Sequence, residues 1–310
     1  MLGESISGHQ WKSAYFRDNP LVGKIWSSRE KAFVSLNSVF SELEKAQFVL
    51  LGEIHTNKDH HLLQAQFLAA IAKSAKKAPR LVVEMIDESF QPLLNEYRSA
   101  NPTDTQGLGN ILKWEKRGWG KWENYQPIFD VAYQYKLEIF SGNLDRDDVR
   151  RIGRGGAKSL KVTEKNKFAL DVPFSEQQSK LLNDMLFESH CKMVPRTALS
   201  PMKLVQQVRD GIMANQMLDA PAGSTAVLIA GNGHTRLDWA TPRILRARAP
   251  EAKIISVAFV EVTGDDKMPQ DYEAPSADKW PVYDYMYFTP KSEIKDQCAE
   301  LIKRFKKKKK

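Results

Sequence analysis

Two segments of this chain share one order of residues, and that order constrains the fold more than any other feature. Residues 48–55 are four apolar residues followed by Gly-Glu-Ile-His. Residues 226–234 are a second apolar run followed by Gly-Asn-Gly-His. A short, uninterrupted apolar run that ends at glycine is typical of a central strand in a parallel sheet, because helices cover both of its faces.

The polar residues that follow these strands are candidates for a functional site. Residues 81–84 and 137–143 repeat the order of an apolar run and then a polar side chain. In parallel sheets, ligands bind beyond the carboxyl ends of the strands, where such side chains meet. We therefore expect one shared site at this edge. Its candidate residues are Glu53, His55, Glu84, Asn143 and His234.

The order of the expected elements gives the fold class. Helices are predicted for residues 61–72 and 88–99, and a further strand for 253–262. Alternating strands and helices indicate an α/β fold with a mainly parallel sheet flanked by helices. The alternation stops after residue 143, where the sequence becomes mostly helical. We predict a discontinuous α/β domain, a smaller inserted helical domain and a basic tail, with the bounds 1–143 and 221–302, 144–220, and 303–310.

Three further predictions concern the ends of the chain. Residues 1–30 mix aromatic and charged side chains, which predicts an arm on the surface of the main body, and apolar spacing predicts a helix over 27–45. Residues 282–288 alternate in polarity, which predicts a late strand at an edge of the sheet. Thr289 and Pro290 form a good helix start, so the last helix is expected to begin there.

Charge and hydropathy exclude several classes of function. The formal net charge is +8, but seven of the 46 basic residues lie in 303–310, so the rest of the chain is nearly neutral. No basic and aromatic motif accompanies this run, and nucleic acid is therefore not an expected partner. The run is predicted to be a solvated tail, or a contact for an anionic membrane surface. No apolar run approaches the length of a membrane span and no signal segment is recognisable, so the chain is expected to be soluble.

The two cysteines and the aromatic residues leave alternatives open. Cys191 and Cys298 are far apart and outside any CxxC pattern, which excludes a disulfide-rich scaffold and a cysteine-built zinc site. His190 is predicted to be packed rather than to bind a ligand. Three tryptophans and Tyr125 lie within residues 114–125, which indicates either the wall of a pocket, a subunit contact or core packing.

Seven segments, taken together, resemble the superfamily that includes the Tiki, TraB and erythromycin-esterase-like proteins, and within it the ChaN-like haem-binding lipoprotein family. The resemblance extends over about residues 24–289. Two departures are Ala-Thr-Pro at 240–242, where the family usually has Gly-Val-Pro, and the absence of a lipoprotein signal. The segments are 51–56, 84–85, 122–127, 143, 190–191, 206–214 and 231–238.

The resemblance implies a haem-binding protein of bacterial iron uptake. It implies b-type haem held as a stacked pair between the subunits of a homodimer, a haem receptor or transporter as a partner, and a periplasmic or membrane-associated location. Tyr125, beside Trp122, is the implied iron ligand, since a phenolate suits Fe(III). Arg236 or the helix after His55 would meet the propionates. His55 and His234 would bind the iron or hydrogen-bond the phenolate.

Two other functions compete with haem binding. The first is a hydrolase in which Glu53, His55, Glu84 and His234 activate water directly or share a divalent metal. The second is a purely structural role, in which the polar residues at the strand ends only order the loops. The sequence favours a haem-binding protein that is not an enzyme over either alternative.

Overall fold

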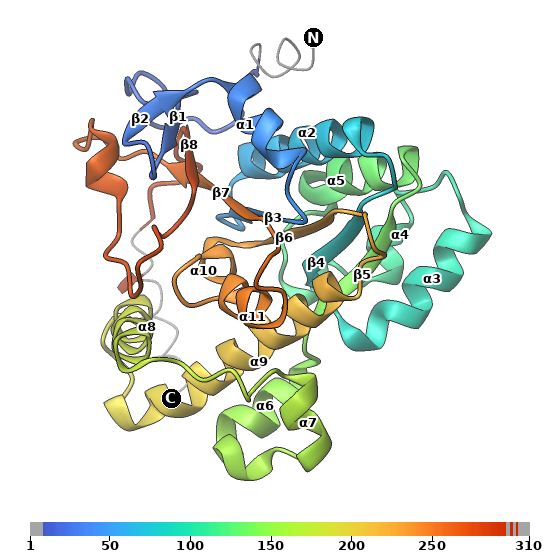
Figure 1. Ribbon diagram of the computed structural model, residues 1–310, viewed down its shortest axis with the longest axis vertical. Coiled ribbons are helices and arrows are strands. Elements are labelled where there is room, and N and C mark those ends of the chain that lie inside the picture. The colour runs from blue at the N-terminus through green and yellow to red at the C-terminus, as the bar shows by residue number, and fades with distance from the viewer. Residues whose placement is uncertain (1–8, 296–297, 300–301, 303–310) are drawn as a thin grey trace.

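The computed structural model describes residues 9–295, 298–299 and 302. Within these residues one sheet of eight strands forms the centre of the molecule, in the order β2-β1-β8-β7-β3-β6-β4-β5 (Figure 1). The strands from β8 to β5 run parallel, while β1 and β2 are antiparallel. The predicted fold class is therefore confirmed. The strands are β1 (Ile25–Ser27), β2 (Ala32–Val34), β3 (Phe48–Glu53), β4 (Arg80–Asp87), β5 (Glu138–Asn143), β6 (Ala226–Gly231), β7 (Ile254–Glu261) and β8 (Tyr285–Thr289).

Helices cover both faces of the sheet. Val49 and Leu51 of β3 pack in one core with α1, α2 and α5, whereas Phe48 and Leu50 pack in a second core with α9 and α11. Figure 1 shows these two helical layers on opposite sides of the strands. Because both faces of β3 are buried, its sequence has no polar alternation. The helices are α1 (Leu36–Leu43), α2 (Lys58–Ser74), α3 (Gln91–Ala100), α4 (Leu108–Ile111), α5 (Trp122–Gln134), α6 (Arg146–Gly155), α7 (Val162–Lys167), α8 (Glu176–Ser189), α9 (Leu199–Leu218), α10 (Asn232–Thr235) and α11 (Thr241–Arg248).

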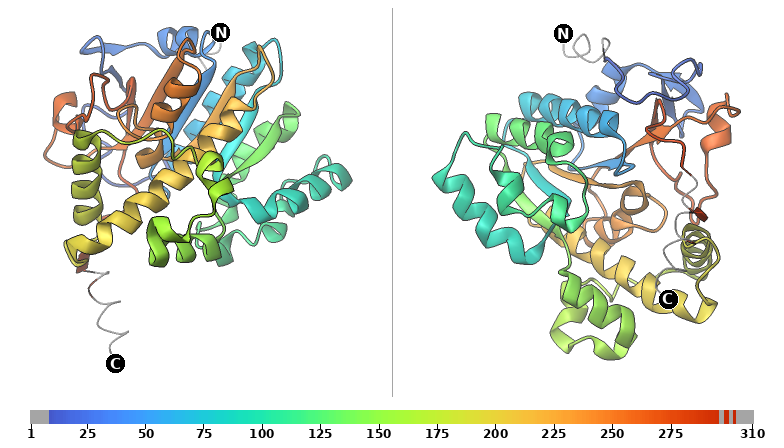
Figure 2. Two further views of the ribbon diagram at one scale, coloured as in Figure 1. Left: turned by 60° about the horizontal axis from the view of Figure 1, so that its bottom comes forward. Right: turned by 180° about the vertical axis from the view of Figure 1, so that it is seen from behind.

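The region 144–220 is helical, as the sequence predicts, and consists mainly of α6 to α9. Figure 2 shows these helices along one side of the molecule. The second half of α9 belongs to the main sheet, however, because Met213 and Met217 pack in the same core as Phe48 and Leu50. The division of the chain into two domains therefore stays a prediction.

The predictions for the chain ends are partly wrong. Residues 25–27 and 32–34 are strands, and the helix predicted from residue 27 begins only at Leu36. β8 is not an edge strand, since β1 pairs antiparallel with it and covers its free side. Thr289 ends β8, and residues 290–295 are not helical because Lys291 pairs with Tyr15 in a β-bridge. The basic tail at 303–310 lies outside the described residues.

Cys191 and Cys298 form a disulfide across 107 residues of sequence. It joins the end of α8 to the C-terminal segment of the chain. Sequence spacing excluded a disulfide-rich scaffold but did not show that these two cysteines meet. The neighbouring His190 has its Nδ1 atom 2.8 Å from the Leu186 carbonyl oxygen, which is a packing interaction within the helix end. Within the described residues, no helix has the length and apolar character needed to cross a bilayer.

Replacing Cys191 and Cys298 together by serine is expected to lower the free energy of unfolding by up to about 4 kcal/mol, because a cross-link over a long loop restricts the unfolded chain. Urea unfolding with and without dithiothreitol measures the effect. The reductant should destabilise the wild type and leave the double variant unchanged. Equal stability of the two proteins under oxidising conditions would contradict the expectation.

Candidate functional site

Three candidate side chains from β3, β4 and β6 meet at the carboxyl edge of the sheet. The His55 Nε2 atom lies 3.9 Å from Glu84 Oε2, and His234 Nε2 lies 3.5 Å from Glu84 Oε1. The parallel registers of β3, β4 and β6 bring these strand ends together although they are up to 180 residues apart in the sequence. The two imidazoles thus lie on either side of one carboxylate.

The histidine motif needs glycine for this close approach. A Cβ atom on Gly231 would lie 3.0 Å from His55 Nε2. A Cβ atom on Gly52 would lie 2.3 Å from Asn232 Oδ1 and 2.4 Å from Thr235 Oγ1, in the turn that carries His234. Each glycine therefore makes room for the histidine segment of the other strand, which explains the repeated Gly-x-x-His order.

His55 is the more accessible of the two histidines, with 38% of its side chain exposed. Its Nδ1 atom lies 2.6 Å from Glu53 Oε1, and its ring meets Trp119 edge to face at a centroid distance of 5.1 Å. Burial by itself would lower the pKa of His55, but the hydrogen bond to Glu53 and the charges of Glu84 and Glu53 outweigh it and raise the pKa to about 9. His55 is therefore an imidazolium at neutral pH.

Glu53 is a buried carboxylate with several polar neighbours. The Tyr125 hydroxyl donates to Glu53 Oε1 over 2.8 Å, and His61 Nε2 lies 2.7 Å from Glu53 Oε2. Burial alone would raise the pKa of Glu53, but the charges and hydrogen bonds of His61 and His55 outweigh it and lower the pKa. Glu53 is therefore ionised, and it fixes the orientation of the His55 ring.

Tyr125, the predicted iron ligand, is fully buried in α5. Its ring stacks on His61 at a centroid distance of 3.7 Å, and its hydroxyl donates to Glu53. Burial, followed by the charge of Glu53, raises the pKa of Tyr125 well above its ordinary value, so the phenol stays protonated. Tyr125 thus supports Glu53 from inside the protein and does not face an open surface.

His234 is held by a residue that sequence reasoning missed. Its Nδ1 atom lies 2.7 Å from Asp210 Oδ1, which α9 brings to the site. Burial opposes the charged imidazole, but Glu84 and Asp210 outweigh it and raise the pKa of His234. The Gly231 N–H donates to Glu84 Oε2 over 2.7 Å. Asp210 occurs in the segment 206–214 of the family resemblance, but only the fold brings it beside His234.

Other predicted residues lie elsewhere. Arg236 is not free for a ligand, because its guanidinium donates to both carboxylate oxygens of Asp238 at 3.0 and 2.8 Å. Trp122 is 6% exposed and packs in the main core, so the prediction that it contacts a ligand is wrong for this structure. Asn143 ends β5, where its side chain accepts a hydrogen bond from the Leu144 N–H.

The N-terminal turn of α2 is also covered. Its first-turn residue Asp59 is buried and accepts hydrogen bonds from the backbone N–H groups of Lys12 and Ser13, while His9 pairs with it at 2.8 Å. The arm 9–13 therefore occupies the position where the sequence analysis expected a propionate. An anion at this site would have to bind elsewhere.

A basic cavity adjoins His55. We call it the arginine pocket: it has a volume of about 380 Å³ and is lined by Arg117, Arg146, Arg150, Arg209, Trp119 and Asn143, among others. Trp119 connects the two features, because it lines the pocket and also contacts His55. The sequence gives no periodic signal for this pocket, since its arginines come from a loop, α6 and α9.

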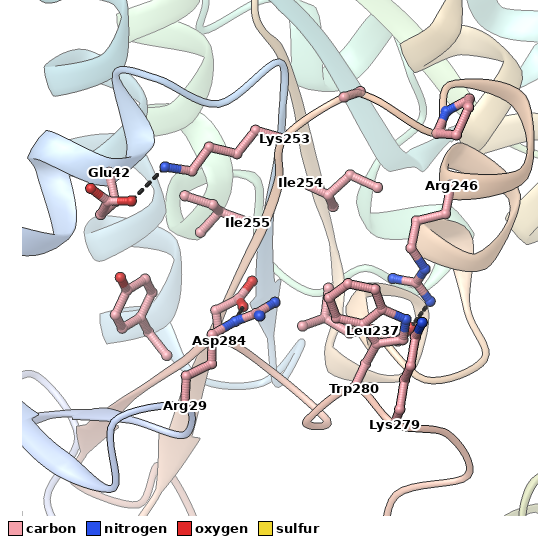
Figure 3. Close-up of a pocket in the computed structure, with 13 residues that line it drawn as sticks. Arg29, Glu42, Leu237, Arg246, Lys253, Ile254, Ile255, Lys279, Trp280 and Asp284 are labelled. Carbon is pink, nitrogen blue, oxygen red and sulfur yellow. Dashed lines mark hydrogen bonds and ion pairs between the residues drawn. The ribbon is translucent and has the colours of Figure 1, made fainter.

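The larger cavity of about 660 Å³ lies at the amino ends of β7 and β8, away from the site (Figure 3). Its charged residues already have partners: Lys253 pairs with Glu42, and Arg29 pairs with Asp284 at 2.6 Å. No candidate residue lines it. Within the described part of the chain, no three His, Cys, Asp or Glu side chains are grouped as a metal site requires.

The Glu53→Gln variant is expected to lower the pKa of His55 from about 9 by one unit or more, because the charge that stabilises the imidazolium is removed. An NMR titration of the histidine rings measures this change. Glu123→Gln, at an exposed position of α5, is the matched control and should leave the pKa unchanged. A folded Glu53→Gln protein with an unaltered His55 titration would refute the assigned role of Glu53.

Comparison with solved structures supports this geometry. The chain is similar to a structure that shows cofacial haem binding to ChaN of Campylobacter jejuni, with 25% identity, a TM-score of 0.67, and coverage of 85% of this chain and 95% of that one. The type III effector HopBA1 is 11% identical with a TM-score of 0.44, covering 82% and 92% of the two chains. An erythromycin esterase in its open conformation is 14% identical with a TM-score of 0.41, covering 72% of each chain.

No curated protein matches the chain at a comparable level. A family model described as haem-binding uptake, Tiki superfamily, ChaN, matches residues 39–245. This match spans about two thirds of the chain and includes Glu53, His55, Glu84, Asp210 and His234. The chain therefore belongs to the ChaN family of the Tiki superfamily.

Proposed function

We propose that this protein binds haem at the carboxyl edge of the sheet, beside His55. The observation that carries the proposal is a partly exposed imidazole, backed by a buried carboxylate and placed next to a tryptophan ring and a cluster of arginines. Membership of the ChaN family and the likeness to a ChaN structure with cofacial haem support it.

The residues at this edge fit the chemistry of haem. Haem has a flat apolar ring, an iron that accepts a nitrogen or oxygen donor, and two carboxylate arms. Trp119 offers an aromatic surface beside His55, and buried N–H groups of Arg117 in the adjoining pocket have no acceptor among the described residues. One edge of the sheet thus contains groups suited to all three parts of the ligand.

His55 suits the iron better than Tyr125 does. A histidine that binds a metal through Nε2 usually donates its Nδ1–H to a carboxylate or carbonyl, which orients the ring and raises its basicity. His55 has this partner in Glu53. The hydroxyl of Tyr125 is buried against the same carboxylate, so Tyr125 acts as a positioning residue for Glu53 and His55.

Location and assembly belong to the proposal as well. A disulfide forms and persists in oxidising compartments, so the pair Cys191 and Cys298 supports a periplasmic location. The half-exposed setting of His55 and Trp119 leaves a haem face open to a second subunit, which supports a haem-bridged homodimer. A role in iron uptake with a haem receptor or transporter as partner follows from the family.

Hemin added to the protein is expected to give the Soret band of bound haem, with a doubling of the mass if haem bridges two subunits. His55→Ala should shift or abolish this band, because it removes the donor to iron, whereas Tyr125→Phe should retain it with a modest loss of affinity. Absorbance titration with mass measurement by light scattering tests these outcomes.

His190→Ala is the matched control for this titration, since His190 lies at the end of α8 and outside the site. Loss of the band in Tyr125→Phe, with retention in His55→Ala, would assign the iron to Tyr125. Absence of binding by the wild type would refute the proposed function.

One observation favours hydrolysis as a second candidate function. His55 and His234 each have a carboxylate at Nδ1, and the Nε2 atoms of both face Glu84. Such an arrangement can move protons on and off a water molecule, as general acid and base catalysis requires. Since no grouped set of three metal ligands is found in the described residues, acid and base catalysis without a metal is the form that this geometry supports.

If the protein is a hydrolase, ester turnover is expected to rise with pH and level off above about 9, because His55 accepts a proton only when its imidazole is neutral. His55→Ala and Glu84→Gln should each lower the rate by about a hundredfold or more. A chromogenic acetate ester measures this, with His190→Ala as the control. Turnover that is equal in His55→Ala and wild type would exclude His55 from catalysis.

A further inference from the structure

We propose that the arginine pocket beside His55 is a carboxylate-binding site that receives the two carboxylate arms of the haem. This inference rests on the proposed function and adds the residues that recognise the ligand. The pocket, about 380 Å³ in volume, opens next to Trp119, which also contacts the His55 ring. A flat ligand beside His55 therefore has its polar edge within reach of the pocket.

The charges in the pocket are strongly unbalanced. Arg117, Arg146, Arg150 and Arg209 line it, against Asp87 as the one carboxylate among the lining residues. Asp87 pairs with Arg117 at 3.2 Å, while the Arg150 guanidinium pairs with Asp147 at 3.2 Å on the solvent side. Neither carboxylate neutralises Arg209 or Arg146, so the pocket has an excess of positive charge.

Buried donors without acceptors give a second, independent sign of a missing anion. The side chain of Arg117 is 8% exposed, and its Nε and Nη1 atoms have no hydrogen-bond acceptor among the described residues. The Nε atom of Arg209 is buried in the same condition. Buried donors that lack acceptors are rare and unfavourable, so a site with several of them is adapted to a ligand that supplies acceptors.

Burial of Arg117 adds to this demand. Burial lowers the pKa of Arg117 against the opposing effect of Asp87, which means that its positive charge is only partly compensated. An anionic ligand would compensate it further. Arg209 also faces the imidazoles of His55 and His234, whose positive charges it opposes, so an anion here would ease repulsion within the whole site.

The geometry of guanidinium groups favours carboxylates as the ligand groups. Their planar N–H pairs match the two oxygens of a carboxylate. Four arginines from three segments of the chain surround the space, which suits two carboxylates better than a single one. The structure leaves no comparable alternative among the residues first expected to meet propionates, because Asp238 occupies Arg236 and the arm 9–13 covers the start of α2.

The test compares two pairs of ligands on the wild type and on two variants. Protoporphyrin IX has the carboxylates without iron, and its dimethyl ester has neither; hemin and hemin dimethyl ester repeat the comparison with iron present. The variants are Arg150→Gln and Arg209→Gln. Arg154→Gln, an exposed arginine on the same helix as Arg150, is the matched control.

Each variant is expected to weaken binding of protoporphyrin IX and of hemin about tenfold, as the loss of one charge-assisted hydrogen bond predicts. The dimethyl esters should bind the wild type about a hundredfold more weakly than the free acids, and the variants should not weaken them further. Porphyrin fluorescence and the Soret band measure the affinities. The Arg154→Gln protein should match the wild type.

The two proposals fail in different ways. If hemin binds but its ester binds equally well, and the variants match the wild type, the arginine pocket does not receive the carboxylates and the proposed function stands. If the wild type binds neither hemin nor protoporphyrin IX, both proposals are wrong. Displacement of protoporphyrin IX by millimolar inorganic phosphate, but not by propionate, would assign the pocket to phosphate and overturn this inference.

Discussion

The buried carboxylate of Glu53 is the interaction on which the rest of the site depends. A charged group without water is unfavourable unless its neighbours replace the lost hydration. Here the neighbours come from three elements: His61 from α2, Tyr125 from α5 and His55 from the loop after β3. Stabilising this one charge fixes two helices against the end of β3 and orients the histidine that faces the cleft.

The second half of the site repeats this principle with a different result. Asp210 orients His234 as Glu53 orients His55, but His234 is nearly buried while His55 is partly exposed. Glu84 lies between the two rings. The exposed imidazole is placed to meet a ligand, and the buried one stabilises the Glu84 charge. Haem binding uses the exposed ring alone, whereas acid and base catalysis would use both.

Packing around the edge of the sheet decides where anionic groups of a ligand can bind. The arm 9–13 occupies the start of α2, and Asp238 holds Arg236, so neither feature is free. Positive charge that lacks full compensation remains on the other side of His55, in the arginine pocket. The direction in which a bound ring would extend is therefore set by which cations already have partners inside the protein.

The sequence by itself determined the parallel α/β fold and the convergence of His55, Glu84 and His234, because apolar runs and strand-end glycines are local signals that a parallel sheet brings to one edge. Only the tertiary structure decided the roles of Tyr125, Trp122 and Arg236, since burial depends on contacts between segments far apart in the chain. For the same reason the disulfide, the pairing of β1 with β8, and the positions of Asp210 and the pocket arginines could not be read from spacing.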